Sequence, residues 1–317
     1  MAPPDPQAVI EDPSSMPTTK AVVPVAGLGT RLLPATKSQP KEMLPDGRKP
    51  VVQYVVEEIQ AAGLTSLLFV TGRSKTAIEN HFDRDAELHR SLSNGGKDGL
   101  LAALAYEDAN VEFFYTRQGE QKGLGHAVSL AEGYVQGEPF VIALGDSIIE
   151  SASTPSVLRR LIDAFEQTGA AAAIAFEEVA PDDVVHYGIA APGEALPAFG
   201  GDVFRIADLI EKPDPASAPS RLAIAGRYVV GAPLFDALRC TQPGKGGEIQ
   251  LTDAFRIMLR EGRTLIGLRM RPGERRHDIG NFESYFRSFL HFALRDPDHG
   301  DALRRTLADE LHDEERK

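Results

Sequence analysis

Residues 20–49 read KAVVPVAGLGTRLLPATKSQPKEMLPDGRK, and this stretch predicts the fold better than any other part of the chain. It begins with a Val-rich apolar run, which is typical of a buried parallel strand, and continues into a glycine loop. Cations follow the loop, among them Arg31 and Lys41. A strand, a loop that allows close backbone approach and a group of cations together predict a phosphate-binding site.

The glycines alone are a weak indication of that site. Gly27-Leu28-Gly29 lacks the third glycine of a dinucleotide-binding fingerprint, because Leu32 stands at that position, and no Gly-Lys-Ser/Thr loop occurs in the sequence. The sequence therefore disfavours a Rossmann dehydrogenase. A tight turn between a strand and a helix would explain the same glycines, and only the neighbouring cations favour phosphate.

Composition narrows the class of protein. The net charge of -12 over 317 residues disfavours a nucleic-acid-binding surface. The single cysteine, Cys240, excludes an internal disulfide framework and a multi-cysteine zinc site, and it suits a reducing compartment, so we expect a cytoplasmic protein. No apolar run reaches about 18 residues, so we expect no contact with a membrane.

Strand-like and helical patterns alternate over residues 20–180, which predicts a doubly wound, mainly parallel sheet of the α/β class. Ligands of such sheets bind at the carboxyl ends of the strands. Residues 181–296 contain shorter strands and turns and predict a mixed extension of the sheet. We expect Ser74 to cap a helix and residues 248–259 to form another.

Both ends of the chain differ from this central domain. Residues 1–19 are rich in Pro, Ser and Asp and are expected to form a disordered tail. Residues 297–317 are charged and are expected to form a peripheral helix or a frayed end. The predicted domain therefore covers residues 20–296.

Further motifs lie along this domain in a fixed order. They are RQG at 117–119, KGLGHA at 122–127, LGD at 144–146, YG at 187–188, IEKP at 210–213, GRY at 226–228, GEIQLTD at 247–253 and HDIG at 277–280. Together with residues 20–45, they resemble the bacterial sugar-1-phosphate nucleotidyltransferases, and more narrowly the branch that joins UTP to glucose-1-phosphate. The resemblance covers about residues 20–295.

The resemblance implies a fold, a reaction and partners. The fold would be a Rossmann-like, doubly wound, mainly parallel mixed sheet with a sugar-binding extension. The enzyme would use Mg²⁺ to make UDP-glucose and pyrophosphate from UTP and α-glucose-1-phosphate, as a homodimer or homotetramer. A nucleotidyltransferase that uses dTTP or another hexose-1-phosphate is one alternative, and a non-catalytic regulatory protein that binds nucleotide sugars is another.

The resemblance also implies a nucleotide half and a sugar half of the site. Arg31 and Lys41 would contact the triphosphate, with Lys41 nearest the reacting centre, and Gln118 would read the uracil edge through its amide donor and acceptor. The other nucleotide-binding residues would be Ala26, Gly27, Gly29, Thr30, Glu42 and Gly123. An exposed surface charge remains an alternative for Arg31 and for Lys41.

In the sugar half, three residues are implied. Gly188 would allow the backbone to approach the hexose, Glu211 would accept hydrogen bonds from sugar hydroxyls, and Lys212 would contact the sugar phosphate as a third catalytic cation. A buried Glu–Lys pair on a strand is the alternative for the last two, which we disfavour because neighbouring strand residues point to opposite faces.

Asp146 and Asp278 are the implied metal ligands. Asp146 follows a wholly apolar strand, so its carboxylate would face the ligand crevice, although Asp is also common in turns. Many relatives carry a second Asp at the next position, where this chain has Ser147. Asp278 could instead cap the helix that starts near Asn281. The neighbouring His277, like His126 and His186, is expected to be structural.

Overall fold

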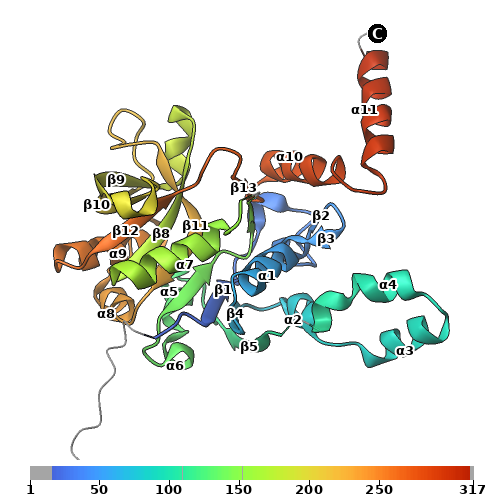
Figure 1. Cartoon of the computed structure of the whole chain (residues 1–317), viewed down its shortest axis with the longest axis horizontal. Coiled ribbons are helices and arrows are strands. Elements are labelled where there is room, and N and C mark those ends of the chain that lie inside the picture. The colour runs from blue at the N-terminus through green and yellow to red at the C-terminus, as the bar shows by residue number, and fades with distance from the viewer. Residues whose placement is uncertain (1–15, 109, 152, 315–317) are drawn as a thin grey trace, which may run out of the picture.

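The computed structural model describes residues 16–108, 110–151 and 153–314 (Figure 1). The main sheet contains β1 (Lys20–Pro24), β4 (Ser66–Thr71), β5 (Glu112–Arg117), β6 (Phe140–Ala143), β8 (Ala172–Glu178), β9 (Gly188–Ala195), β10 (Val203–Glu211), β11 (Leu222–Val230) and β12 (Leu265–Arg269). Two small antiparallel sheets pair β2 (Pro45–Asp46) with β3 (Lys49–Pro50) and β7 (Ser147–Glu150) with β13 (Arg275–Asp278).

Helices cover both faces of the main sheet. The described α-helices are α1 (Val51–Ala61), α2 (Thr76–Phe82), α3 (Ala86–Asn94), α4 (Asp98–Ala103), α5 (Leu124–Ser129), α6 (Glu132–Val135), α7 (Val157–Thr168), α8 (Pro233–Cys240), α9 (Leu251–Arg260), α10 (Phe282–Ala293) and α11 (Gly300–Glu314). Helices α1 and α7 pack on one face and α5, α8 and α9 on the other. None of the described helices is long and apolar enough to cross a membrane.

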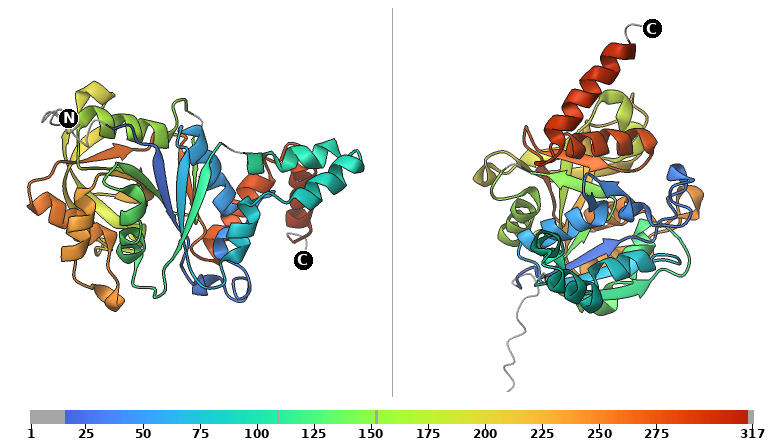
Figure 2. Two further views of the ribbon diagram at one scale, coloured as in Figure 1. Left: turned by 90° about the horizontal axis from the view of Figure 1, so that it is seen from below. Right: turned by 90° about the vertical axis from the view of Figure 1, so that its right-hand side faces the viewer.

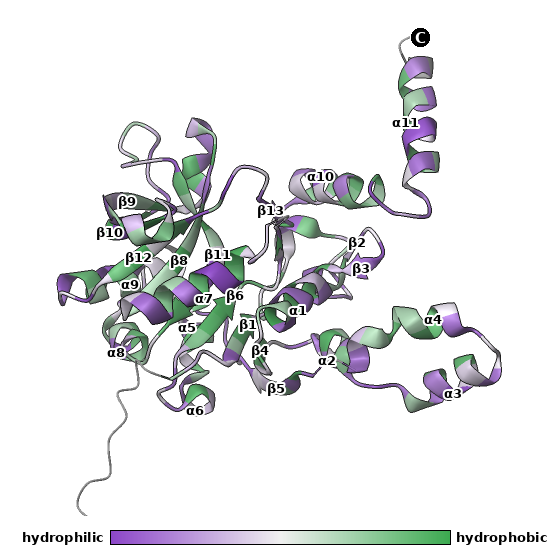
Figure 3. Cartoon of the chain, viewed as in Figure 1, coloured by the Kyte–Doolittle hydropathy of each residue, from purple (hydrophilic) through white to green (hydrophobic). Residues whose placement is uncertain are grey.

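The Val-rich run is the buried strand that the sequence predicts. In β1, Ala21 and Val23 contact the core on the α1 and α7 side, whereas Val22 contacts the opposite core. Alternate residues of a strand point to opposite faces, so a strand buried on both sides must be apolar throughout. Figure 3 shows this hydrophobic character along the central strands.

The order of the strands is β5-β4-β1-β6-β11-β8-β12-β10-β9 among the described residues. The pairs β5–β4, β4–β1 and β1–β6 are parallel, which confirms the doubly wound prediction for this part. The chain changes direction across the sheet between β1 and β6, and such a switch point opens a ligand crevice. Strand β11 lies between β6 and β8 and is antiparallel to both, an arrangement that the pattern of strands in the sequence did not indicate.

Two predicted helix starts are wrong. Ser74 does not cap α2, because it adopts a left-handed φ of 63° and the residue before the helix is Lys75. Helix α9 begins at Leu251 instead of residue 248. The preceding residues are extended because the N-H of Ile249 donates to Lys122 O (2.8 Å) and its carbonyl accepts from Gly125 N (2.8 Å).

The ends of the chain behave differently from each other. Most of the predicted tail, residues 1–15, lies outside the described residues, but Thr18 is buried and its N-H donates to Glu166 Oε1 (2.9 Å). At the other end, α11 is an exposed helix that points away from the body of the molecule (Figure 2). Of the two alternatives expected for residues 297–317, the peripheral helix is the one seen over residues 300–314, and residues 315–317 lie outside the described residues.

A buried guanidinium ties three elements together beneath the crevice. Arg227 on β11 is fully buried and donates to Glu58 Oε2 on α1 (2.7 and 3.0 Å). It also donates to the carbonyls of Leu144 (3.4 Å) and Ser147 (2.8 Å), which flank Asp146. Arg227 thus supports the turn that carries a candidate metal ligand.

We predict that Arg227→Met lowers the free energy of unfolding by about 3–5 kcal/mol, because it leaves the Glu58 carboxylate without its buried partner. Urea unfolding measures the change. Arg239→Met is the matched control, since Arg239 pairs with Glu132 and Asp236 on the surface and should matter little. Equal effects of the two substitutions would contradict the prediction.

Candidate functional site

Two adjoining cavities open at the carboxyl ends of β1 and β6, where the topology places a crevice. One has a volume of about 480 Å³ and the other about 870 Å³. Both are lined by Arg31, Leu124, Leu144 and Asp146, so the cavities meet at these residues.

The structure brings all of the predicted site residues into these two cavities. The smaller cavity is lined by Ala26, Gly27, Gly29, Thr30, Arg31, Lys41, Glu42, Gln118, Gly123 and Asp146. The larger cavity is lined by Arg31, Asp146, Gly188, Glu211, Lys212 and Asp278. The residues that the sequence assigned to nucleotide and to sugar thus separate in space, and their individual roles stay predictions.

Gln118 lies at the wall of the smaller cavity and is buried. Its amide nitrogen donates to Gly123 O (3.2 Å) and faces His126 Nδ1 (2.9 Å). Both N-H groups therefore have protein acceptors, and the amide oxygen is the group left for a ligand. This differs from the expectation that the same amide both donates to the base and accepts from it.

Gly123 is required by its surroundings. Its φ is +91°, and a Cβ there would lie 2.8 Å from the carbonyl oxygen of Ile249. A side chain at Gly123 would push its own loop away from the extended segment that precedes α9. Gly123 therefore holds the smaller cavity against the C-terminal half of the fold.

Lys41 and Asp146 form an ion pair at the junction of the cavities. Both side chains are largely buried, at 15% and 21% exposure, so Lys41 is not a free surface charge. Burial opposes charge on both groups, yet the Lys41 ammonium holds the pKa of Asp146 below its usual value. Asp146 and Glu42 in turn hold the pKa of Lys41 above its usual value. Both groups are therefore charged near neutral pH.

Glu42 lies deeper than the sequence suggested. Its carboxylate is buried and accepts from the Lys75 ammonium (2.8 Å). Burial raises the pKa of Glu42, and the two lysines oppose that rise. The side chain thus supports Lys41, and the predicted contact of Glu42 with nucleotide has no further support from its position.

Asp278 lies beside Asp146 and does not cap a helix. The cap of α10 is Asn281, whose Oδ1 accepts from Ser284 N (2.9 Å), so the capping alternative is wrong. Burial and the negative charge of Asp146 raise the pKa of Asp278, against the influence of Arg276, Lys41 and Arg31. Two carboxylates whose charges disfavour each other, with hard oxygen donors, fit a divalent cation such as Mg²⁺.

In the larger cavity, Glu211 is held in place by two neighbours. Its Oε2 accepts from Thr252 Oγ1 (2.8 Å), and its Oε1 lies 3.3 Å from the Lys212 ammonium. A Glu–Lys contact therefore forms, because Lys212 lies just past the end of β10 with a left-handed φ of 47°, but it is not the buried strand pair, since the Lys212 side chain is 49% exposed. A Cβ on Gly188 would lie 2.7 Å from Ile224 and 3.2 Å from Glu211 Oε2, so only glycine leaves this wall open.

Sequence reasoning missed several residues of the site. Thr252 was noted only as part of a helix start, and Gln121 donates to Ala26 O (2.9 Å) from a loop with no distinctive pattern. The Arg276 guanidinium lies 4.5 Å from the centre of the Tyr187 ring and pairs with Glu177. The signals in the sequence were the position of Thr252 inside the GEIQLTD motif and that of Arg276 beside the HDIG motif.

Comparisons with known proteins agree with this geometry. A family model described as nucleotidyl transferase matches residues 20–293. A UTP–glucose-1-phosphate uridylyltransferase of Staphylococcus epidermidis is 43% identical over 285 residues, which cover 90% of this chain and 96% of the relative. The enzyme of that name from Staphylococcus saprophyticus is also 43% identical, over 89% of this chain and 94% of the relative.

Solved structures are similar over almost their whole length. UTP-bound UGPase from Acinetobacter baumannii is 36% identical, with a TM-score of 0.83 over 92% of this chain and 99% of that chain. A UDP-glucose pyrophosphorylase complexed with UDP-glucose is also 36% identical, with a TM-score of 0.77 over 87% and 98%.

We predict that Asp146→Asn lowers the pKa of Asp278, because the substitution removes a neighbouring negative charge and leaves the cations in place. The titration of the Asp278 carboxyl carbon, followed by NMR on metal-free protein, measures the shift. Asp208→Asn, which alters a carboxylate outside both cavities, is the control. An unchanged titration in the Asp146→Asn protein would show that the two carboxylates do not interact.

Proposed function

This chain belongs to the nucleotidyl transferase family, and we propose that it transfers the uridylyl group of UTP to α-D-glucose-1-phosphate, giving UDP-glucose and pyrophosphate. The observation that carries this proposal is the pair of adjoining cavities. One cavity is bordered by the glycine loop and the other by Gly188 and Glu211, and they meet at Arg31 and Asp146. Two anionic substrates could react where the cavities join.

In this reaction, an oxygen of the sugar phosphate forms a bond to the α-phosphorus of UTP while the bond from that phosphorus to the leaving pyrophosphate breaks. The two reactants repel each other. Unit charges about 4 Å apart repel by about 4 kcal/mol at an effective dielectric constant of about 20. Arg31, Lys41 and Lys212 would offset this repulsion with their positive charges. Catalysis would then depend on positioning of the two reactants and on electrostatic stabilisation of the transition state. No covalent intermediate with a side chain is required.

We propose Mg²⁺ as the metal, held by Asp146 and Asp278. Mg²⁺ binds through few carboxylates together with substrate oxygens and water, which suits a site with two carboxylates. When bound, the ion would neutralise phosphate charge. Ser147 is a weak ligand in place of a second Asp, and its Oγ instead lies within 3.4 Å of Asp278 Oδ1. Ser147 thus orients the carboxylate.

Different chemical groups of the protein would recognise the base and the sugar. The free amide oxygen of Gln118 is suited to accept the N3-H of uracil, and thymine offers the same group. Glu211, oriented by Thr252, is suited to accept from sugar hydroxyls, and the open wall at Gly188 leaves room for the ring. Selection between uracil and thymine therefore depends on more than Gln118.

We also propose that the chain forms a homodimer or homotetramer. Large apolar side chains are exposed on α10 and α11, among them Phe286 at 57% and Leu311 at 56% exposure. Exposed apolar groups on neighbouring helices are typical of an interface. We keep the cytoplasmic location as a prediction from the sequence.

We predict that pyrophosphate release is faster with UTP and glucose-1-phosphate than with any other pair in a panel of nucleotides and sugar phosphates. The panel must include dTTP and hexose-1-phosphates other than glucose-1-phosphate. A faster rate with dTTP would favour a thymidylyltransferase. Binding of UDP-glucose without turnover in the presence of Mg²⁺ would favour a regulatory protein.

We predict that Asp146→Asn lowers kcat at least ~100-fold while the circular dichroism spectrum is unchanged, because the variant loses a metal ligand and the partner of Lys41. Steady-state kinetics over a range of Mg²⁺ concentrations measure the loss. Asp208→Asn is again the matched control, because its ion pair with Arg256 lies outside both cavities. Near-normal turnover of the Asp146→Asn enzyme would remove Asp146 from the metal site.

A further inference from the structure

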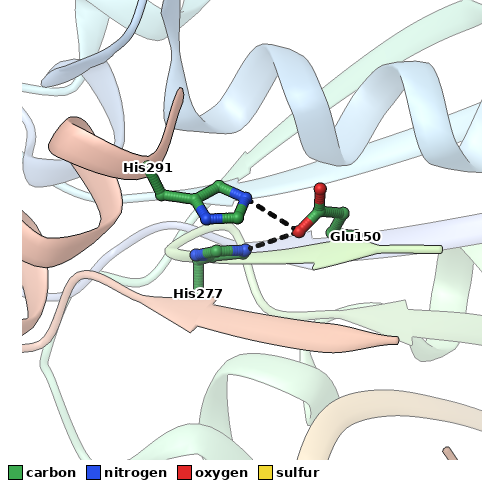
Figure 4. A group of neighbouring side chains, drawn as sticks. All are labelled: Glu150, His277 and His291. Carbon is green, nitrogen blue, oxygen red and sulfur yellow. Dashed lines mark hydrogen bonds and ion pairs between the residues drawn. The ribbon is translucent and has the colours of Figure 1, made fainter. Parts of the chain in front are cut away.

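Three side chains other than the candidate metal ligands Asp146 and Asp278 converge at one point (Figure 4). Glu150 ends β7, His277 lies on β13 and His291 lies on α10. The Nε2 atoms of His277 and His291 lie 3.2 and 2.9 Å from the same oxygen, Glu150 Oε2. In the part of the chain that the structure describes, this is the one group of three His, Cys, Asp or Glu side chains with ligand atoms all within 4.8 Å of one another.

Secondary structure holds the group together. Strands β7 and β13 pair with Arg275 opposite Glu150 and His277 opposite Ile148, so Glu150 and His277 are diagonal neighbours on one face. Helix α10 brings His291 over them, and the two imidazole centres are 4.5 Å apart. The His277 side chain is 6% exposed and the His291 side chain 10%, so both rings are fixed by packing.

The spacing of these atoms matches a metal site. Two ligands at about 2.0–2.1 Å from a tetrahedral ion lie roughly 3.3 Å apart. The two nitrogen–oxygen distances are 3.2 and 2.9 Å. An ion could therefore bind with small movements of the side chains.

His291 also lacks a satisfactory partner. Its Nε2 is buried and makes no hydrogen bond of good geometry among the described residues, although Glu150 Oε2 is 2.9 Å away. A buried polar atom without a well-directed partner costs free energy, and binding an ion would remove that cost.

We propose that Glu150, His277 and His291 bind a divalent transition-metal ion of the Zn²⁺ class. Two imidazole nitrogens and one carboxylate suit Zn²⁺ and disfavour Mg²⁺, which prefers oxygen ligands. Both histidines line the larger cavity, which gives the ion a route of entry and leaves a coordination position for water.

One residue opposes binding. The exposed Arg295 donates to His291 Nδ1 (2.9 Å), which places the proton of a neutral imidazole on Nε2. A metal at Nε2 requires that proton to be on Nδ1, so Arg295 must turn away as the ion binds. Arg295→Gln should therefore tighten binding.

The site would link a peripheral helix to the catalytic part of the protein. Its ribbon, β7 with β13, begins at Ser147 and ends at Asp278, both beside the reacting centre. An ion bound to His291 would fasten α10 to this ribbon. The inference does not depend on the proposed reaction, since it concerns other ligands and another ion.

The test uses full-length protein without an affinity tag, freed of metal by a chelator and then held in excess Mg²⁺ to occupy the oxygen-rich site. Titration with Zn²⁺ by calorimetry, and with Co²⁺ by visible absorption, should give one ion per chain with nitrogen coordination. We expect His291→Gln and Glu150→Gln each to weaken binding at least ~10-fold, and Arg295→Gln to strengthen it.

The matched control is His89→Gln. His89 forms a comparable pair with Glu107 (2.8 Å), but this pair belongs to no group of three possible metal ligands among the described residues, so its removal should leave Zn²⁺ affinity unchanged. Asp146→Asn should also leave it unchanged. The proposal is overturned if no ion binds, if binding survives both the His291 and Glu150 substitutions, or if Asp146→Asn abolishes it.

Discussion

The ion pair between Lys41 and Asp146 is the interaction on which the candidate site depends. Neither charge could be buried alone, so the loop after β1 and the turn after β6 must meet across the crevice. The pair is also the centre of a longer series of neighbouring charges, which alternate in sign except where Asp146 lies beside Asp278. Lys75 pairs with Glu42, and the negative charge of Glu42 raises the pKa of Lys41. The charge of Asp146 raises the pKa of Asp278, and the Arg276 guanidinium lies 4.0 Å from the Asp278 carboxylate. Substrate phosphates and a cation would enter a site whose charges already balance one another.

Prediction from the sequence succeeded at positions where the local structure requires one type of residue. The Val-rich run predicted β1, and Gly123, Asp146 and Gly188 lie at the cavities because only a glycine or a carboxylate meets the local need. Prediction failed where the outcome depends on a distant partner. The start of α9 is set by hydrogen bonds of Ile249 with Lys122 and Gly125, and His291 meets His277 only because α10 folds back over β13. No spacing within either segment contains that information.

The central position of β11 explains why the two halves predicted from the sequence are not separate bodies. This strand pairs with β6 on one side and β8 on the other, so residues 20–180 and 181–296 contribute strands to one continuous sheet. Arg227 on the same strand donates to the carbonyls on both sides of Asp146. The geometry of the turn that carries Asp146 therefore depends on a residue much later in the chain, since Arg227 follows Leu144 by 83 positions.

The same insertion of β11 has a consequence for the newly made polypeptide. Strands β6 and β8 leave the ribosome before the strand that must lie between them, so each presents an unpaired edge until residues 222–230 have been synthesised. These edges belong to wholly apolar strands, FVIA in β6 and the AAIAF portion of β8. Between residues 143 and 230 these two edges are thus open to wrong strand pairing until β11 covers them, and the other edge of β8 stays open until β12 is synthesised.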